Sequence, residues 1–62
     1  MTSAPTFDAV FTAMQAAAGG DLAARVALPP EPDLDHEPTK LAITLNLLLD
    51  DMSYRAEQRA RF

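Results

Sequence analysis

Two short apolar stripes at helical spacing, separated by a proline-containing segment, limit most strongly what this chain can fold into. The first stripe recurs at intervals of 3, 4 and 3 residues and comprises Phe7, Val10, Met14 and Ala17. The second recurs at intervals of 4, 3 and 4 residues and comprises Leu41, Leu45, Leu48 and Met52. Apolar residues at alternating three- and four-residue intervals line one face of an α-helix. The sequence therefore predicts an all-α chain with two amphipathic helices, over about residues 6–18 and 38–62.

The segment between the stripes, about residues 19–37, cannot be helical throughout. Gly19 and Gly20 follow the first stripe, and a glycine in the left-handed conformation commonly ends a helix. Prolines, which break a helix interior, follow at Pro29, Pro30 and Pro32. Ten extended residues span about 33 Å, more than the roughly 20 Å rise of the first helix. The connector can therefore return to the start of the first helix, and the two helices then lie parallel.

The start of the second helix is set by Pro38. The residue before a proline avoids the α conformation, so we expect Glu37 to cap this helix rather than belong to it. Between Pro38 and Phe62 the sequence contains no further glycine or proline that would end the helix. We therefore expect the second helix to continue as a coiled coil toward an attached domain.

The small size of the chain requires a second copy to cover the stripes. A chain of 62 residues buries only about 60% of the surface that its unfolded form exposes. Disulfides are excluded because the chain has no cysteine, and a zinc site cannot be built on the single histidine, His36. The remaining route is association, so the sequence predicts a homodimer that forms a parallel four-helix bundle.

Charge and composition exclude several other functions. Nine acidic and five basic residues give a net charge of −4, which disfavours nucleic acid and anionic membranes as partners. Neither an apolar run of about 20 residues nor a secretory signal is found, so we expect no membrane insertion and a cytoplasmic location. The serines and threonines have no paired base, and we expect neither catalysis nor a cofactor.

Two stretches of the sequence resemble one known family. The stretch from Gly20 to Val26, GDLAARV, places a glycine two residues before an apolar residue, Leu22, and a second apolar residue four positions later. The stretch from Glu37 to Leu48, EPTKLAITLNLL, places a glutamate four residues before a Leu-Ala pair and then an apolar-Asn pair. Together they resemble the HAMP domain, the signal-relay module of bacterial sensor histidine kinases, chemoreceptors and adenylyl cyclases.

The HAMP resemblance implies an architecture and a function for the whole chain. It implies a coiled-coil dimer in which Leu22 and Val26 of the connector pack onto the helices. It also implies that the segment is not itself an enzyme. Its role would be to pass a conformational signal from a covalently attached input region to a C-terminal output domain, such as the histidine kinase of a two-component system.

Two other functions stay open beside the relay. A passive dimerisation bundle needs the same stripes, although it does not need the connector motif. A phosphoacceptor helix of a histidine kinase is suggested loosely by His36-Glu37, but that histidine must lie exposed partway along a helix. The acidic residues do not form a calcium-binding pattern, and we expect them to be solvated or to act as caps; they are Asp33, Asp35, Glu37, Asp50 and Asp51.

Overall fold

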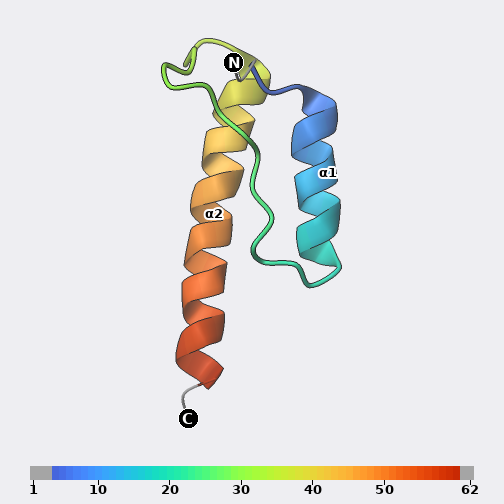
Figure 1. Cartoon of the computed structure of the whole chain (residues 1–62), viewed down its shortest axis with the longest axis vertical. Coiled ribbons are helices and arrows are strands. Elements are labelled where there is room, and N and C mark those ends of the chain that lie inside the picture. The colour runs from blue at the N-terminus through green and yellow to red at the C-terminus, as the bar shows by residue number, and fades with distance from the viewer. Residues whose placement is uncertain (1–3, 61–62) are drawn as a thin grey trace.

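The chain folds into two helices joined by a long connector. A computed structural model describes residues 4–60, and the predicted helical residues 61 and 62 lie outside this range. Helix α1 comprises Phe7–Ala18 and helix α2 comprises Glu37–Ala60, with no strand among the described residues (Figure 1). The prediction of an all-α fold is confirmed, and the predicted helix limits differ from the observed ones by a single residue at each start.

Local capping explains where α1 begins and ends. The hydroxyl of Thr6 accepts a hydrogen bond from the backbone N–H of Ala9 at 3.1 Å, which satisfies one of the free donors of the first turn. At the other end Gly20 has a φ of 106°, in the left-handed region. Its N–H donates to the Ala17 carbonyl at 3.0 Å, and the Asp21 N–H donates to the Ala16 carbonyl at 3.0 Å. This is the Schellman arrangement, and it turns the chain sharply out of the helix.

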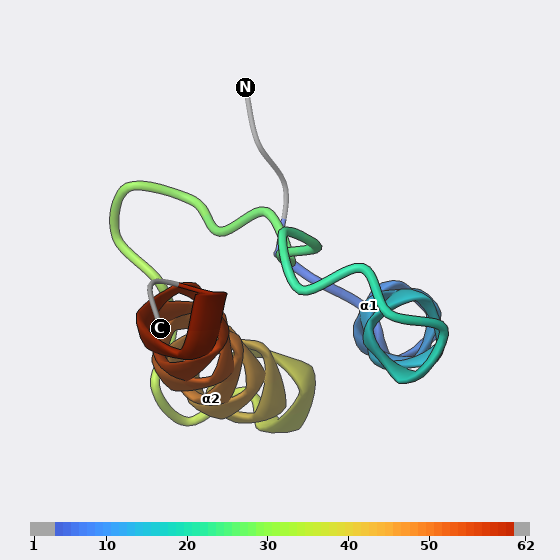
Figure 2. The same cartoon turned by 90° about the horizontal axis from the view of Figure 1, so that it is seen from below.

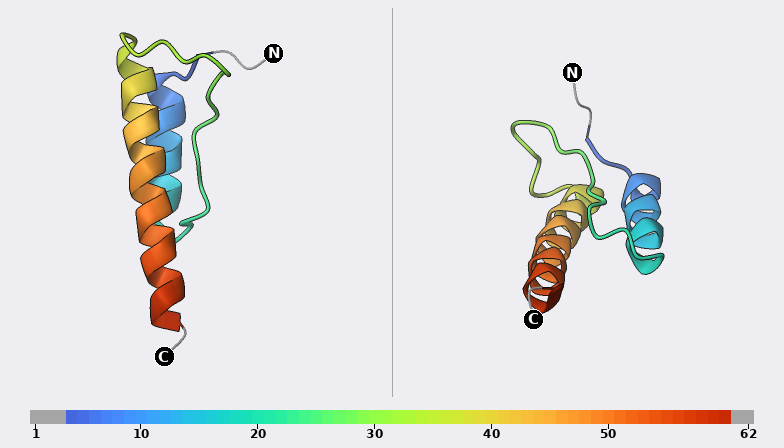
Figure 3. Two further views of the ribbon diagram at one scale, coloured as in Figure 1. Left: turned by 90° about the vertical axis from the view of Figure 1, so that its left-hand side faces the viewer. Right: turned by 60° about the horizontal axis from the view of Figure 1, so that its bottom comes forward.

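The two helices run in the same direction. Both begin at the upper end of the molecule in Figure 1. The connector runs from the lower end of α1 back to the upper end of the molecule, where α2 begins. Viewed along the helices and from the side, the connector lies over one side of the helix pair (Figures 2 and 3). Helix α2 has 24 residues and α1 has 12. Their lengths are therefore about 36 and 18 Å, and α2 projects well beyond the end of α1.

The start of α2 corrects one prediction. Glu37, expected to cap the helix, is its first residue. The capping position belongs to His36, whose carbonyl accepts a hydrogen bond from the Lys40 N–H at 3.0 Å. Its ring Nδ1 also lies 2.8 Å from the hydroxyl of Thr39, a buried residue. A proline within the first turn has no N–H that needs a partner, so Pro38 fits after Glu37.

A small core lies where both helices meet the connector. Its buried residues come from all three segments, and they are Val10, Ala13, Val26 and Ala42. Leu28 and Leu45 pack against this cluster and are partly buried. Leu49, further along α2, is 1% exposed. Ala13 and Ala42 have small side chains, which leave room in this cluster for Val26 of the connector.

Candidate functional site

The connector is fixed to α2 by one amide side chain. The carboxamide Oδ1 of Asn46 accepts a hydrogen bond from the Val26 N–H at 2.9 Å, and its Nδ2 donates to the Val26 carbonyl at 3.0 Å. Val26 is 5% exposed, so its backbone groups have little access to water. A buried backbone group without a partner is costly, and the connector has no neighbouring strand to supply one. Asn46 therefore satisfies both groups and sets the position at which the connector docks.

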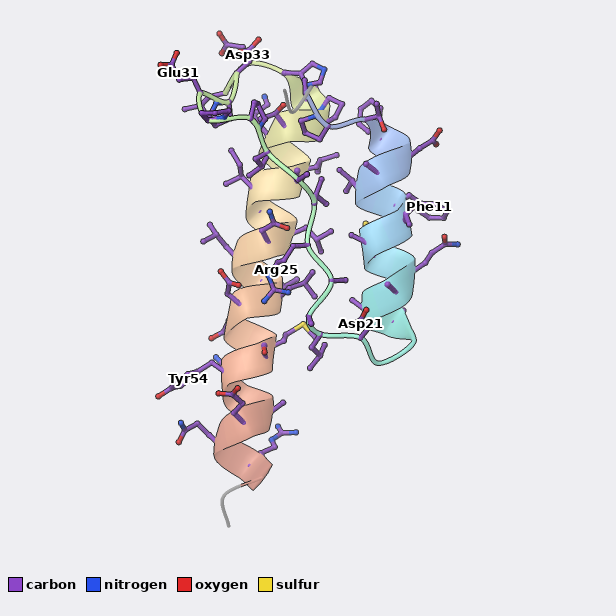
Figure 4. The ribbon with its side chains drawn as sticks, viewed as in Figure 1. Phe11, Asp21, Arg25, Glu31, Asp33 and Tyr54 are labelled. Atoms are coloured by element: carbon purple, nitrogen blue, oxygen red, sulfur yellow. The ribbon has the colours of Figure 1, made fainter. Side chains whose placement is uncertain are left out.

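The neighbouring connector residue, Arg25, adds an ion pair one helical turn further along α2. Its Nε donates to Asp50 Oδ1 at 2.9 Å, and another guanidinium nitrogen lies 2.7 Å from the same oxygen. The guanidinium also donates to the Leu22 and Ala24 carbonyls, so it ties the connector to itself as well as to the helix. Figure 4 shows Arg25 extending along the front of α2. The Asp50 side chain is 66% exposed, which limits the contribution of the pair to stability.

Two predicted connector anchors occupy different environments. Val26 is buried against the helices, in agreement with the prediction. Leu22 is only half-buried. It lies beyond the end of α1 and lines an open depression of about 220 Å³ together with α2 residues that include Met52 and Ala56. Because α1 has already ended at this level, no helix of the same chain remains to cover Leu22 on its second side.

Most of the predicted stripe residues form an exposed surface in the single chain. We call this surface the open apolar face, and it consists of Phe7, Met14, Leu41, Leu48 and Met52, which are between 39% and 59% exposed. Of the other predicted stripe residues, Val10 is buried, whereas Ala17 and Leu45 are half-buried. Large apolar side chains at this exposure and at regular helical spacing make this face a candidate interaction surface.

Helical geometry places the open apolar face away from the connector. Successive helix residues turn by about 100°, so Leu48 is turned by about 160° from Asn46, which holds the connector. Leu41 is turned by about 140° from Asn46 by the same rule. On α1, Met14 is turned by about 100° from Ala13 and by about 40° from Val10, and both of these residues pack in the cluster that contains Val26. The connector lies over one side of the helix pair (Figure 3), and the α2 surface turned away from it carries the exposed Leu41 and Leu48.

The sequence did not identify every residue that organises this site. Ala13, Ala42 and Leu49 form much of the buried core, although they lie outside the predicted stripes. Asn46 was recognised only as part of the family pattern, without a role. An asparagine in the middle of a helix and between leucines is a poor helix former, and this was the one signal that its side chain serves another purpose.

The acidic residues and His36 mostly make contacts with residues close to them in the sequence. Asp51 pairs with Arg55 at 3.0 Å and Glu37 pairs with Lys40 at 2.8 Å, so these carboxylates are exposed but not simply solvated. Glu31 and Asp33 project from the connector near the start of α2 (Figure 4). Because His36 precedes α2, it does not provide the mid-helix histidine that a phosphoacceptor site requires.

The chain matches no family model, no curated protein and no solved structure. Neither α1 nor α2 contains an apolar stretch long enough to cross a membrane. Among residues 4–60, no group of histidine, aspartate or glutamate side chains is arranged to hold a metal ion.

Proposed function

We propose that this chain is a HAMP-like relay module that works as a parallel homodimer. Two copies bring their open apolar faces together around a two-fold axis and form a four-helix bundle, with a connector on the outside of each half. An input region and an output domain, covalently attached in the full-length protein, supply and receive the signal.

One observation carries the proposal: the connector covers a single side of two parallel helices, and the opposite side is apolar. A two-fold axis brings the same surface of each copy together, so the face must complement itself. Phe7 and Met14 from α1, with Leu41 and Leu48 from α2, present large side chains suited to interdigitation. Their burial in a dimer removes apolar surface from water, which is the main favourable term in association.

The relay, rather than passive dimerisation, is favoured by the way in which the connector is held. Asn46 and Asp50 fix two successive connector residues to α2 through polar contacts. A bundle that only dimerises could join its helices with a short loop, because helix connections in bundles commonly use 2–8 residues. A long connector that fastens α2 to α1 lets a displacement of the first helix reach the second.

The dimer is tested with two neighbouring leucines. Leu48 is 53% exposed on the open apolar face, whereas Leu47 is 64% exposed and turned away from it by about 100°. Sedimentation equilibrium of the wild-type chain should give twice the 6.7 kDa of one copy. Leu48→Glu should give a monomer, since it places two carboxylates at the interface, and Leu47→Glu should remain a dimer. If the two variants behave alike, or the wild-type chain is a monomer, the proposed dimer is wrong.

The relay is tested by changing core volume at Met14. The chain is fused in continuous heptad register to a histidine kinase or cyclase output domain, and Met14 is replaced by Ile, Val or Ala. If two packings of the bundle have similar free energies, output activity should change in a graded way, because about 1.4 kcal/mol alters their ratio tenfold. Variants that dimerise normally while output stays constant would leave the bundle as a passive dimerisation domain.

A further inference from the structure

The end of α2 carries two arginines on the same face as the apolar stripe. Arg55 follows Leu48 by seven residues and Arg59 follows it by eleven, so both lie within about 20° of Leu48 around the helix. They line the open depression with Leu22, Met52 and Ala56. The apolar face of α2 thus becomes basic immediately beyond Met52, in a chain whose net charge is −4.

In a parallel homodimer this arrangement brings like charges together. Each residue of the α2 seam faces its own copy across the two-fold axis, so two Arg55 and two Arg59 side chains converge. Asp51 is the one acidic partner among the described residues, and it pairs with Arg55 at 3.0 Å while both side chains remain more than half exposed. Glu57 lies about 120° from Asp51 and about 180° from Leu48, on the far side of the helix. At this face the described residues of the two chains therefore contribute four guanidinium groups against two Asp51 carboxylates.

We propose that the paired α2 ends bind a phosphate-type anion between the arginines of the two chains. The surplus of positive charge attracts an anion, and a guanidinium group binds phosphate oxygens through two parallel hydrogen bonds. Arg55 and Arg59 border the open depression of about 220 Å³ in each chain, next to Leu22, Met52 and Ala56, so their guanidinium groups lie at an accessible surface. The site rests on the proposed dimer, because one chain supplies only half of it.

Binding at this position would control how the relay is coupled to the output domain. Without the anion, repulsion among the arginines separates the α2 ends beyond Met52. With the anion bound, the two ends are held together and the coiled coil continues toward the output domain. The ligand therefore favours the closely paired state, and its effect on the dimer depends on its differential affinity for that state.

The test compares the dimer association constant in pyrophosphate and in sodium chloride of the same ionic strength and pH. Sedimentation velocity is performed on the wild-type chain, Arg59→Gln, the double variant R55Q/R59Q and the control Lys40→Gln. The control removes one positive charge at the opposite end of α2. With one site per dimer, wild-type association should rise about elevenfold when pyrophosphate is present at ten times its Kd. Lys40→Gln should show the same increase, and R55Q/R59Q should show none.

A second signature is expected in chloride alone. R55Q/R59Q should dimerise more tightly than the wild-type chain, because the repulsion between copies is removed. Binding to phosphatidylglycerol vesicles, measured by flotation, tests whether a lipid headgroup rather than a free anion supplies the phosphate. Phosphatidylcholine vesicles are the control. Binding to either source that is lost in R55Q/R59Q supports the site.

Two failures can be told apart. A wild-type dimer that responds to neither pyrophosphate nor anionic vesicles, or a response that R55Q/R59Q retains, overturns the anion site and leaves the dimer in place. A chain that is monomeric under every condition overturns the proposed dimer itself.

Discussion

Removing the Asn46 side chain should release the connector from α2. In Asn46→Ala, the Val26 N–H and carbonyl lose the partners that they have at 2.9 and 3.0 Å. Each unsatisfied buried polar group costs about 1–3 kcal/mol, and here two groups lose their partners. The lower part of this range applies to each of them because both hydrogen bonds are only partly buried. Alanine is the better helix former and returns up to about 0.7 kcal/mol. The net loss of folding free energy should be about 2 kcal/mol.

The loss is measured by thermal and urea unfolding, monitored by circular dichroism at one fixed protein concentration. In a domain of this size, 1 kcal/mol shifts Tm by about 4–8 °C, so a decrease of roughly 8–16 °C is expected. Gln58→Ala is the matched control on the same helix, since the Gln58 side chain makes no hydrogen bond to another described residue. Its effect should stay within about 0.5 kcal/mol.

Hydrogen exchange gives a second, local measurement for the same variant. The Val26 amide should exchange slowly in the wild-type chain and lose its protection in Asn46→Ala, while amides in the middle of α2 stay protected. If Asn46→Ala and Gln58→Ala have equal Tm values and the Val26 amide keeps its protection, the connector is held by apolar packing alone and the docking role of Asn46 is wrong.

Three further outcomes are expected from unfolding measurements. Gly20→Ala should destabilise the chain by about 1–2 kcal/mol because Gly20 has a φ of 106°. Gly19→Ala, at a φ of −83°, should be neutral or slightly stabilising. Equal effects of the two substitutions would contradict the left-handed cap. Leu22→Ala should cost about 1–2 kcal/mol, less than the 2–5 kcal/mol of a fully buried leucine, and a larger loss would mean that a partner buries it. Asp50→Asn should cost less than about 1 kcal/mol and should lose that difference in high salt, since its pair with Arg25 is exposed; a salt-independent loss would argue against the pair.

The local structure of this chain could be predicted from its sequence. The alternation of apolar residues identified both helices, and the glycine pair identified the end of α1. Such features depend on nearby residues, since helix periodicity and the left-handed conformation of Gly20 are properties of a few consecutive positions. The start of α2 was missed by one residue because Pro38 fits the first turn whether Glu37 caps the helix or is its first residue. Only the hydrogen bond from the Lys40 N–H to the His36 carbonyl distinguishes these two alternatives.

The tertiary structure alone decided which apolar residues each chain buries for itself. Ala13, Ala42 and Leu49 are buried, while Leu41 and Leu48, which belong to the predicted stripe, remain exposed. When the apolar surface of a helix is wide, either edge of that surface can pack against the connector. The periodicity of the sequence does not indicate which edge does so. The backbone groups of Val26 settle this choice, because they need hydrogen bonds that only Asn46 supplies. Once the connector is fixed on that side, helical geometry leaves the opposite side of the pair open.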